Sequence, residues 1–177
     1  MDCGRLLQAL DLAAHKHRDQ RRKDPARSPY INHPIAVAAK LWELGVHDET
    51  ALLAAVLHDT IEDTDTTREE LATLFGEDVA SVVAEVTDDK SLPKARRKEL
   101  QIEHAPHLSR AAKLVKMADK LCNVRDIVDA PPSDWPLERR QQYLVWAAEV
   151  VAGLRDAHPD LAAAFDAQHA RGVAANP

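Results

Sequence analysis

The organising stretch of the chain reads Ala51-Leu52-Leu53-Ala54-Ala55-Val56-Leu57-His58-Asp59-Thr60-Ile61-Glu62-Asp63-Thr64. Its apolar part contains good helix formers and neither Gly nor Pro, which predicts a buried helix. The polar motif that follows should therefore lie at the end of that helix. His58 and Glu62 are four residues apart, as are Asp59 and Asp63, so on a helix these side chains share neighbouring faces of one turn.

The polar motif has two interpretations. Imidazole and carboxylate groups at the end of an apolar helix are costly to bury unless their charge is compensated, and a divalent metal ion is the simplest compensation. Alternatively, His58 and Asp59 cap the helix, and Glu62, Asp63 and Asp65 form a solvated acidic loop. A metal site requires further ligands, so the rest of the chain decides between the two.

His33 is the first further ligand candidate. It lies in Tyr30-Ile31-Asn32-His33-Pro34-Ile35, where Pro34 suits the first position of a helix that ends at Gly45. A histidine at a helix N-terminus is favoured as the neutral imidazole, which is the form that binds metals. A lone histidine in this place would more often be structural or exposed. His33 gains significance because His58 and Asp59 follow one helix later.

Asp119 is the second candidate. The segment from Ala111 to Val128 carries a wide apolar stripe, and Asp119 falls inside that stripe. An ionised carboxylate on an apolar face is costly unless it is paired or bound to a metal. In the alternative interpretation, Asp119 pairs with Lys116 or Lys120 on a helix turned outward. Asn123 lies one turn further along the same face, where it can hydrogen-bond a ligand.

These candidates form a mixed nitrogen and oxygen ligand set, namely His33, His58, Asp59 and Asp119. Such a set suits manganese, iron or zinc, and the two carboxylates favour manganese. A bound ion of this kind lowers the pKa of water and polarises a phosphoryl oxygen. Glu62 and Asp63 stand beside the site without being needed as ligands. The pattern therefore indicates hydrolysis of a phosphoester or a pyrophosphate.

Basic residues gather between the first helix and Pro29, although the formal net charge of the chain is -6. Such a cluster is either a phosphate-binding patch or a solvated helix end favoured by the helix dipole. Its members are Lys16, Arg18, Arg21, Arg22, Lys23 and Arg27. Lys94, at the edge of a polar loop, and Tyr143, on a later helix, are further candidates for a pocket, although a helical aromatic is usually core.

Composition predicts an all-α fold in one domain. At 177 residues the chain suits a single domain spanning 1–177, and its few aromatics (4%) and many Ala, Leu and Val residues suit a compact helical bundle. We expect a core over about residues 6–154. A last helix from about Leu161 to His169 should pack on it, and residues 172–177 should be frayed.

Composition also excludes several classes of protein. The net charge of -6 argues against a nucleic-acid-binding protein. Neither an apolar run of about twenty residues nor a signal-peptide pattern is found, so no membrane or secreted location is indicated. Cys3 and Cys122 show neither zinc-type spacing nor a disulfide framework, which favours a reducing, cytoplasmic setting. No pattern indicates the oligomeric state.

The order of the candidate ligands resembles that of the HD superfamily of metal-dependent phosphohydrolases. Several longer motifs resemble the hydrolase domain of RelA/SpoT-type alarmone enzymes, and in particular the stand-alone small alarmone hydrolases. The similarity extends from about Leu6 to Leu154. Its motifs are Arg21-Arg22-Lys23-Asp24, Pro29-Tyr30-Ile31-Asn32-His33-Pro34, His58-Asp59-Thr60-Ile61-Glu62-Asp63-Thr64, Glu85-Val86-Thr87-Asp88-Asp89-Lys90 and Lys113-Leu114-Val115-Lys116-Met117-Ala118-Asp119-Lys120-Leu121-Cys122-Asn123-Val124-Arg125-Asp126.

The resemblance implies removal of the 3′-pyrophosphate from guanosine tetraphosphate or pentaphosphate (ppGpp or pppGpp) with one Mn²⁺ ion, yielding pyrophosphate and GDP or GTP. The metal ligands would be His33, His58, Asp59 and Asp119, and the catalytic acidic pair would be Glu62 and Asp63. By the same resemblance, Arg22 and Lys23 hold guanine and phosphate, and Asn123 contacts the ribose. Lys23 and Lys94 are expected to offset charge on the pyrophosphate.

Cys122 departs from the resemblance, because many relatives have an aromatic residue there. The change affects the expected pocket shape and leaves every ligand position intact. Two other functions stay open. The first is an HD phosphohydrolase for another nucleotide, for instance one that removes the 2′-phosphate of NADPH. The second is a non-catalytic sensor that binds alarmone. A degenerate sensor should have lost metal ligands or the acidic pair, and this sequence keeps all six residues.

Overall fold

Helix α3 (Glu49–Leu57) lies at the centre of the fold. Every side chain from Ala51 to Leu57 is buried, as expected for a helix that is apolar on all faces. The Asp48 side chain caps its N-terminus by accepting a hydrogen bond from the Ala51 N–H at 2.8 Å. The buried helix predicted from the apolar run is therefore confirmed. Its neighbours are α1 (Cys3–Lys16), α2 (Asn32–Glu43), α6 (Glu77–Val86) and α8 (Arg110–Asp129).

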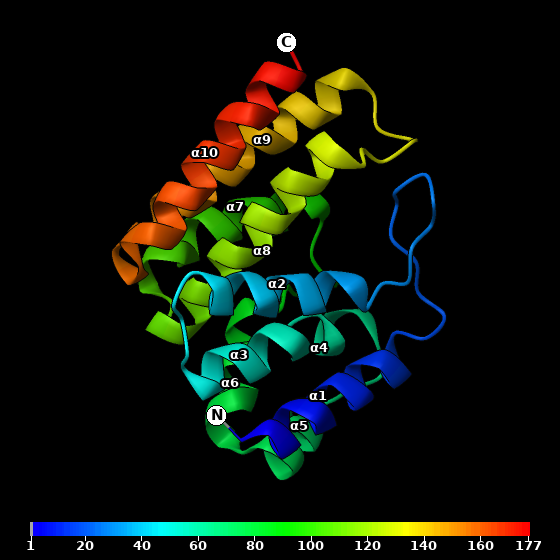
Figure 1. The fold of residues 1–177 in the computed structure, drawn as a ribbon, viewed down its shortest axis with the longest axis vertical. Coiled ribbons are helices and arrows are strands. Elements are labelled where there is room, and N and C mark those ends of the chain that lie inside the picture. Colours follow the sequence, from blue (N-terminus) through cyan, green and yellow to red (C-terminus); the bar gives the residue numbers. More distant parts are fainter. Residues whose placement is uncertain (1) are drawn as a thin grey trace.

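The structure, a computed structural model, describes residues 2–177. In Figure 1, α2 crosses the middle of the molecule between α8, α9 and α10 on one side and α1, α3 and α5 on the other. The described residues form no strand, only an isolated bridge between Arg21 and Pro29, so the all-α prediction is confirmed. The remaining elements are α4 (Thr60–Asp63), α5 (Arg68–Phe75), α7 (Lys94–His104), α9 (Leu137–Ala152), α10 (Pro159–Ala175) and two short 3-10 helices (Ala105–His107 and Arg155–Ala157). Across residues 2–177, none of the helices combines the length and apolar character that a membrane span requires.

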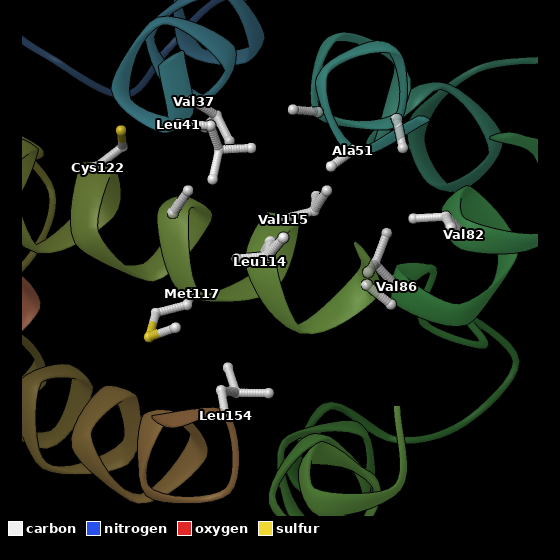
Figure 2. Packing of buried hydrophobic residues seen from close by; sticks show 14 of the residues in the cluster. Val37, Leu41, Ala51, Val82, Val86, Leu114, Val115, Met117, Cys122 and Leu154 are labelled. Carbon is white, nitrogen blue, oxygen red and sulfur yellow. The ribbon is translucent and has the colours of Figure 1, made fainter. Parts of the chain in front are cut away.

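Helix α8 joins the two halves of the core. It contacts α2, α3 and α6 on one side and α9 and α10 on the other. Figure 2 shows Val115 directed toward the side of α3 and α6 and Met117 directed toward Leu154. Both side chains are fully buried, and burial of each contributes about 1.5–3 kcal/mol to folding. The position of α8 is thus fixed from two sides.

Local residues set several of the helix ends. Thr67 caps α5 by accepting a hydrogen bond from the Glu70 N–H at 3.1 Å. Gly76 ends α5 with φ of 90°, a left-handed conformation that glycine adopts without strain. Helix α2 begins at Asn32 rather than at Pro34. The proline still lies in the first turn, where its missing N–H breaks no intrahelical hydrogen bond.

The prediction for the C-terminus was wrong. We expected a last helix over Leu161–His169 and frayed residues 172–177, but α10 begins earlier and continues to Ala175. Asn176 is only 4% exposed, and its side chain donates a hydrogen bond to the Gly172 carbonyl at 2.9 Å. The Gln141 amide of α9 donates to the Asn176 carbonyl at 3.2 Å. Polar contacts that the sequence pattern does not reveal therefore hold this end.

Candidate active site

Three of the predicted ligands meet in a buried cluster. His33 lies in the first turn of α2, His58 directly follows α3, and Asp119 lies in the middle of α8. One ligand atom of each side chain lies within 4.8 Å of the others. His33 Nε2 is 3.0 Å from Asp119 Oδ1, and His58 Nε2 is 3.8 Å from the same oxygen. The packing of three helices thus brings together residues that are up to 86 positions apart.

Asp59 stands at the edge of this cluster. Its Oδ2 atom lies 3.1 Å from His58 Nε2 and accepts a hydrogen bond from the Tyr30 hydroxyl at 2.6 Å. The backbone of Asp59, with φ of -98° and ψ of -3°, separates α3 from the short helix α4. This break lets consecutive side chains, His58 and Asp59, approach one another.

The orientation of His58 fits a metal ligand. The imidazole Nδ1 lies 2.8 Å from the Ala55 carbonyl, which can only accept a hydrogen bond, so Nδ1 carries the proton in the neutral ring and Nε2 keeps its lone pair. Among the described residues, buried Nε2 has no hydrogen-bond partner of acceptable geometry. Buried polar atoms normally have partners. A buried imidazole nitrogen beside two carboxylates is suited to a divalent cation.

The electrostatics of the cluster also favour a cation. Burial lowers the pKa of His58, but the Asp59 and Asp119 carboxylates outweigh it and raise the pKa to about 9. Burial also lowers the pKa of His33, which keeps this imidazole neutral. Although burial alone would raise it, Lys120 and His33 hold the pKa of Asp119 well below its usual range. Both carboxylates are therefore ionised and available as ligands.

The alternative interpretation of Asp119, an ion pair with Lys116 or Lys120 on a helix turned outward, is correct in one part. Lys120 Nζ lies 3.0 Å from Asp119 Oδ2, so the expected ion pair exists. Both residues are buried, however, and the helix is not turned outward. Lys116 does not pair with Asp119 but donates to the Val86 carbonyl at 2.9 Å. Asp119 therefore uses one oxygen for Lys120 and presents the other to the histidines.

The acidic pair lies on α4, directly beyond the cluster. Glu62 lines the cavity of about 140 Å³ that also contains the three ligands. Its Oε2 atom accepts a hydrogen bond from the Asp88 N–H at 3.1 Å, and burial raises its pKa. Asp63 faces a larger cleft, where it accepts a hydrogen bond from Gln20 at 2.8 Å and forms an ion pair with Lys90. The two carboxylates therefore have different surroundings.

The larger cleft has a volume of about 690 Å³, within the range typical of small-molecule sites. It brings together four of the predicted substrate-binding residues, namely Arg22, Lys23, Asn123 and Tyr143. Arg22 donates to Asn123 Oδ1 at 3.2 Å and to Asp126 Oδ2 at 2.6 Å. Asn123 in turn donates to Asp119 Oδ1 at 2.5 Å. A hydrogen-bonded chain therefore connects the cleft with the metal ligands.

Lys94 lies elsewhere, in an adjoining cavity of about 520 Å³. Lys23 and Tyr143 line both hollows. Burial and the neighbouring Arg139 lower the pKa of Lys94, which shows that positive charge is concentrated there. Tyr143 packs against Trp135 with ring centroids 5.6 Å apart, and burial raises its pKa to about 12. Its hydroxyl is therefore protonated.

Only part of the predicted basic patch borders the cleft. Arg21, Arg22 and Lys23 line it. Lys16 instead forms ion pairs with Asp65 at 2.9 Å and with Glu70 of α5 at 3.3 Å. These ion pairs connect α1 to its neighbours, so Lys16 does not serve as a phosphate ligand.

The family model described as "HD domain" matches residues 9–149 of the chain. The chain belongs to the HD-domain family. The predicted resemblance to the HD superfamily is confirmed by this match, whose range includes the candidate ligands, Glu62 and Asp63.

Several relatives of this HD-domain chain carry names that state an activity. The chain is 54% identical over 166 residues to guanosine-3′,5′-bis(diphosphate) 3′-pyrophosphohydrolase MESH1 of Xenopus tropicalis, with 93% of each protein covered. It is 55% identical over 161 residues to the Homo sapiens protein of the same name, with 90% of each covered. A solved structure, described as a metazoan orthologue of SpoT that hydrolyses ppGpp, superposes with a TM-score of 0.91 at 49% identity and covers 95% of both chains.

The structure adds residues to the HD-domain site that sequence reasoning did not select. Tyr30 and Asp88 lie inside the quoted motifs, but no spacing rule distinguishes them from their neighbours. Lys116 could have been found, because it lies on the apolar stripe of α8 that revealed Asp119. The other additions come from loops and helix ends and are Gln20, Lys90, Gln101, Asp126 and Trp135.

Proposed function

We propose that this HD-domain protein hydrolyses guanosine-3′,5′-bis(diphosphate) at its 3′ position and releases pyrophosphate. The observation that carries the proposal is the buried cluster of His33, His58 and Asp119, which shares a cavity with Glu62 and adjoins a cleft of about 690 Å³. Relatives more than 50% identical over nine-tenths of the chain bear the name of this activity. Substrates are ppGpp, which yields GDP, and pppGpp, which yields GTP.

One divalent ion would be held by His33, His58, Asp59 and Asp119. The mixture of imidazole and hard carboxylate oxygens supports Mn²⁺. When bound, such an ion supplies a Lewis acid for the phosphoryl group and lowers the pKa of water. The unpartnered Nε2 of His58 and the ionised Asp119 are the observations on which this assignment rests.

Glu62 is the residue that we assign to proton transfer. The carboxylates of Glu62 and Asp63 both line the larger cleft, but only Glu62 also lines the cavity of the candidate ligands. A carboxylate with a raised pKa is a better proton acceptor than an ordinary one, and burial raises the pKa of Glu62. The hydrogen bond from the Asp88 N–H keeps one carboxylate oxygen of Glu62 in place. Asp63, fixed by Gln20 and Lys90, orients the water or substrate.

The bond changes follow from hydrolysis. The oxygen of water forms a bond to the phosphorus that is attached to the ribose 3′ oxygen, and the bond between that phosphorus and the 3′ oxygen breaks. Glu62 accepts a proton from water and returns it to the 3′ oxygen as that oxygen leaves, so that the carboxylate is restored. Arg22, Lys23, Asn123 and Tyr143 line the space for the nucleoside. Lys94, in the adjoining cavity with Arg139, suits phosphate groups that are not being cleaved.

Product analysis tests the proposal. Metal-stripped protein is incubated with ppGpp, with and without Mn²⁺, and nucleotides and pyrophosphate are separated by anion-exchange chromatography. We expect GDP and pyrophosphate only when metal is present, and from a Glu62→Gln variant only slow residual turnover that single-turnover experiments can measure. Tight binding of ppGpp by metal-loaded protein without turnover would instead support a sensor. Phosphate release from NADPH under the same conditions would support the other hydrolase.

A further inference from the structure

Lys116 is a buried cation without an anionic partner. It is 8% exposed, and its Nζ donates to the Val86 carbonyl at 2.9 Å. Within residues 2–177, no carboxylate lies within ion-pairing distance of this ammonium. The other two buried lysines of α8 differ, because Lys113 pairs with Asp156 at 2.8 Å and Lys120 with Asp119 at 3.0 Å. An ammonium has three N–H donors, so two donors of Lys116 remain without a protein partner.

Such a residue is costly to keep. A buried charge normally requires a partner of opposite charge or hydrogen bonds to all its donors. Burial lowers the pKa of Lys116, and nearby Lys120 lowers it further, while the more distant carboxylates of Asp88, Asp119 and Glu62 oppose both. Hydrophobic side chains of similar length, such as Met, would fill the same space without this cost. A bound anion would remove this cost by accepting hydrogen bonds from the ammonium.

The position of Lys116 indicates which ligand. It lies three residues before Asp119 on α8, so both side chains share one face of the helix. Lys116 lines the 140 Å³ cavity of the metal ligands and also a neighbouring cavity of about 160 Å³. In that cavity the Asp59 and Asp119 carboxylates would compensate a divalent ion, but the Lys116 ammonium would still have no carboxylate partner. An anion that reaches both the ion and the ammonium would supply it.

We propose that Lys116 donates a hydrogen bond to a phosphate oxygen of the diphosphate group being cleaved. This inference rests on the proposed function and adds a residue that touches the substrate at the reacting group. The ammonium and the metal site lie on the same cavity, so together they bind the charge of the diphosphate. The competing interpretation is purely structural, in which Lys116 only satisfies the last carbonyl of α6.

Binding of inorganic pyrophosphate tests the inference without any turnover. Pyrophosphate is titrated calorimetrically into the wild type and the Lys116→Met variant at a fixed free Mn²⁺ concentration, and Mn²⁺ binding is measured separately. Loss of a hydrogen bond to a charged group should weaken pyrophosphate binding by about tenfold or more. Affinity for Mn²⁺ should not fall, because Lys116 is not a ligand. Lys116→Gln, a second neutral variant, should weaken pyrophosphate binding in the same way.

Lys113→Met is the matched control, since it removes a buried lysine from the same helix outside the site. It should leave pyrophosphate binding unchanged. Thermal unfolding of all variants identifies any that do not fold. Unchanged pyrophosphate affinity in a folded neutral variant, or no pyrophosphate binding by the wild type, would overturn the inference. Absence of ppGpp hydrolysis alongside a Lys116-dependent pyrophosphate site would reject the proposed function only.

Discussion

At the scale of single residues, the site depends on groups that hold the ligands as well as on the ligands themselves. Tyr30 donates a hydrogen bond to Asp59 Oδ2, Ala55 fixes His58 through its carbonyl, and Asn123 donates to Asp119. Partners of this kind set the direction of a ligand and its basicity. The arrangement of the cluster is therefore established by the fold before any ion binds.

Replacement of Tyr30 by Phe should weaken Mn²⁺ binding by about 10- to 100-fold, because Asp59 loses the bond that holds it toward His58. Calorimetric titration of the metal-free protein measures this. Tyr143→Phe is the control, since in the described structure the Tyr143 hydroxyl forms no hydrogen bond with any of the candidate metal-binding side chains. Equal Mn²⁺ affinity of the wild type and Tyr30→Phe would show that Asp59 does not depend on Tyr30.

Metal affinity should rise with pH. The Asp59 and Asp119 carboxylates raise the pKa of His58 from 6.5 to about 9 in the metal-free protein, so at neutral pH a proton occupies this ligand and must leave before the ion binds. This proton stabilises the metal-free fold below about 6.5 and ceases to do so as the pH rises through about 9. We expect release of about one proton per ion at pH 7, falling to about half a proton near pH 9 and lower at higher pH. Calorimetry in two buffers of different ionisation enthalpy measures the release; no release at pH 7 would contradict it.

The residues predicted from sequence are those whose chemistry conflicts with their surroundings. Asp119 could be predicted because a carboxylate interrupts an apolar stripe, and His58 because it ends an apolar helix. Lys94 was placed with the other substrate-binding residues, but it lines a separate cavity. Its position depends on how α7 docks on α9, and no local pattern encodes that docking. Gln101 and Lys90 were missed for the same reason.

At the scale of elements, the loop 87–93 between α6 and α7 contacts both acidic residues. The Asp88 N–H bonds Glu62, and Lys90 pairs with Asp63. The loop is held from α7 by Gln101, whose amide lies 2.9 Å and 2.8 Å from the two Asp88 carboxylate oxygens. The separate surroundings of Glu62 and Asp63 thus originate in one short segment.

Gln101→Met should lower kcat about tenfold and change KM little, because loss of a bond to the charged Asp88 releases the loop that holds Glu62. Steady-state kinetics with ppGpp measure this. In a Glu62→Gln background, the same substitution should cause almost no further loss in single-turnover experiments, since both changes act through one group. Additive losses would show that Gln101 acts by another route.

Two glycines lie at close contacts between helices, and we expect replacement by alanine to destabilise the fold at only one of them. A Cβ at Gly153, at the end of α9, would lie 2.9 Å from both the Ala105 Cβ and the Pro106 Cδ, which are rigidly attached. Gly153→Ala should therefore cost about 1–3 kcal/mol in the free energy of unfolding. A Cβ at Gly172 would meet the flexible end of Leu144 at 2.8 Å. Gly172→Ala should be nearly neutral, because helix propensity improves by about 1 kcal/mol. Urea unfolding compares them; equal losses would contradict the argument.

Helix positions were largely predictable because caps and breakers are local. Thr67 and Gly76 flank α5, and Pro93 directly precedes α7. The break between α3 and α4 was not predicted, since no breaker residue occurs at His58 or Asp59. The C-terminal end of α10 was also missed, because its order depends on hydrogen bonds with Gln141, 35 residues away. Tertiary contacts decide such cases.

At the scale of the whole molecule, the metal should stabilise the fold. The candidate ligands come from α2, the end of α3 and α8, so the proposed ion would bind only the folded state and shift the unfolding equilibrium. At a Mn²⁺ concentration of about 100 times its Kd, the gain is about 2.7 kcal/mol, which corresponds to a rise in Tm of roughly 5–10 °C for a chain of this size. Differential scanning calorimetry with and without chelator measures the shift. An Asp119→Asn variant should show almost none.

The span between ligands also affects the protein during its synthesis. His33 and Asp119 are 86 residues apart, and α8 must dock against α2 before they meet. A ribosome-bound chain that has exposed only the first three helices presents one of the candidate ligands, His33, and no complete site. Such a nascent chain should not capture manganese, iron or zinc, so the metal can enter only after most of the polypeptide has emerged and folded. If an ion is bound, its identity would then be selected by a nearly complete fold rather than by the side chains of an unfolded segment.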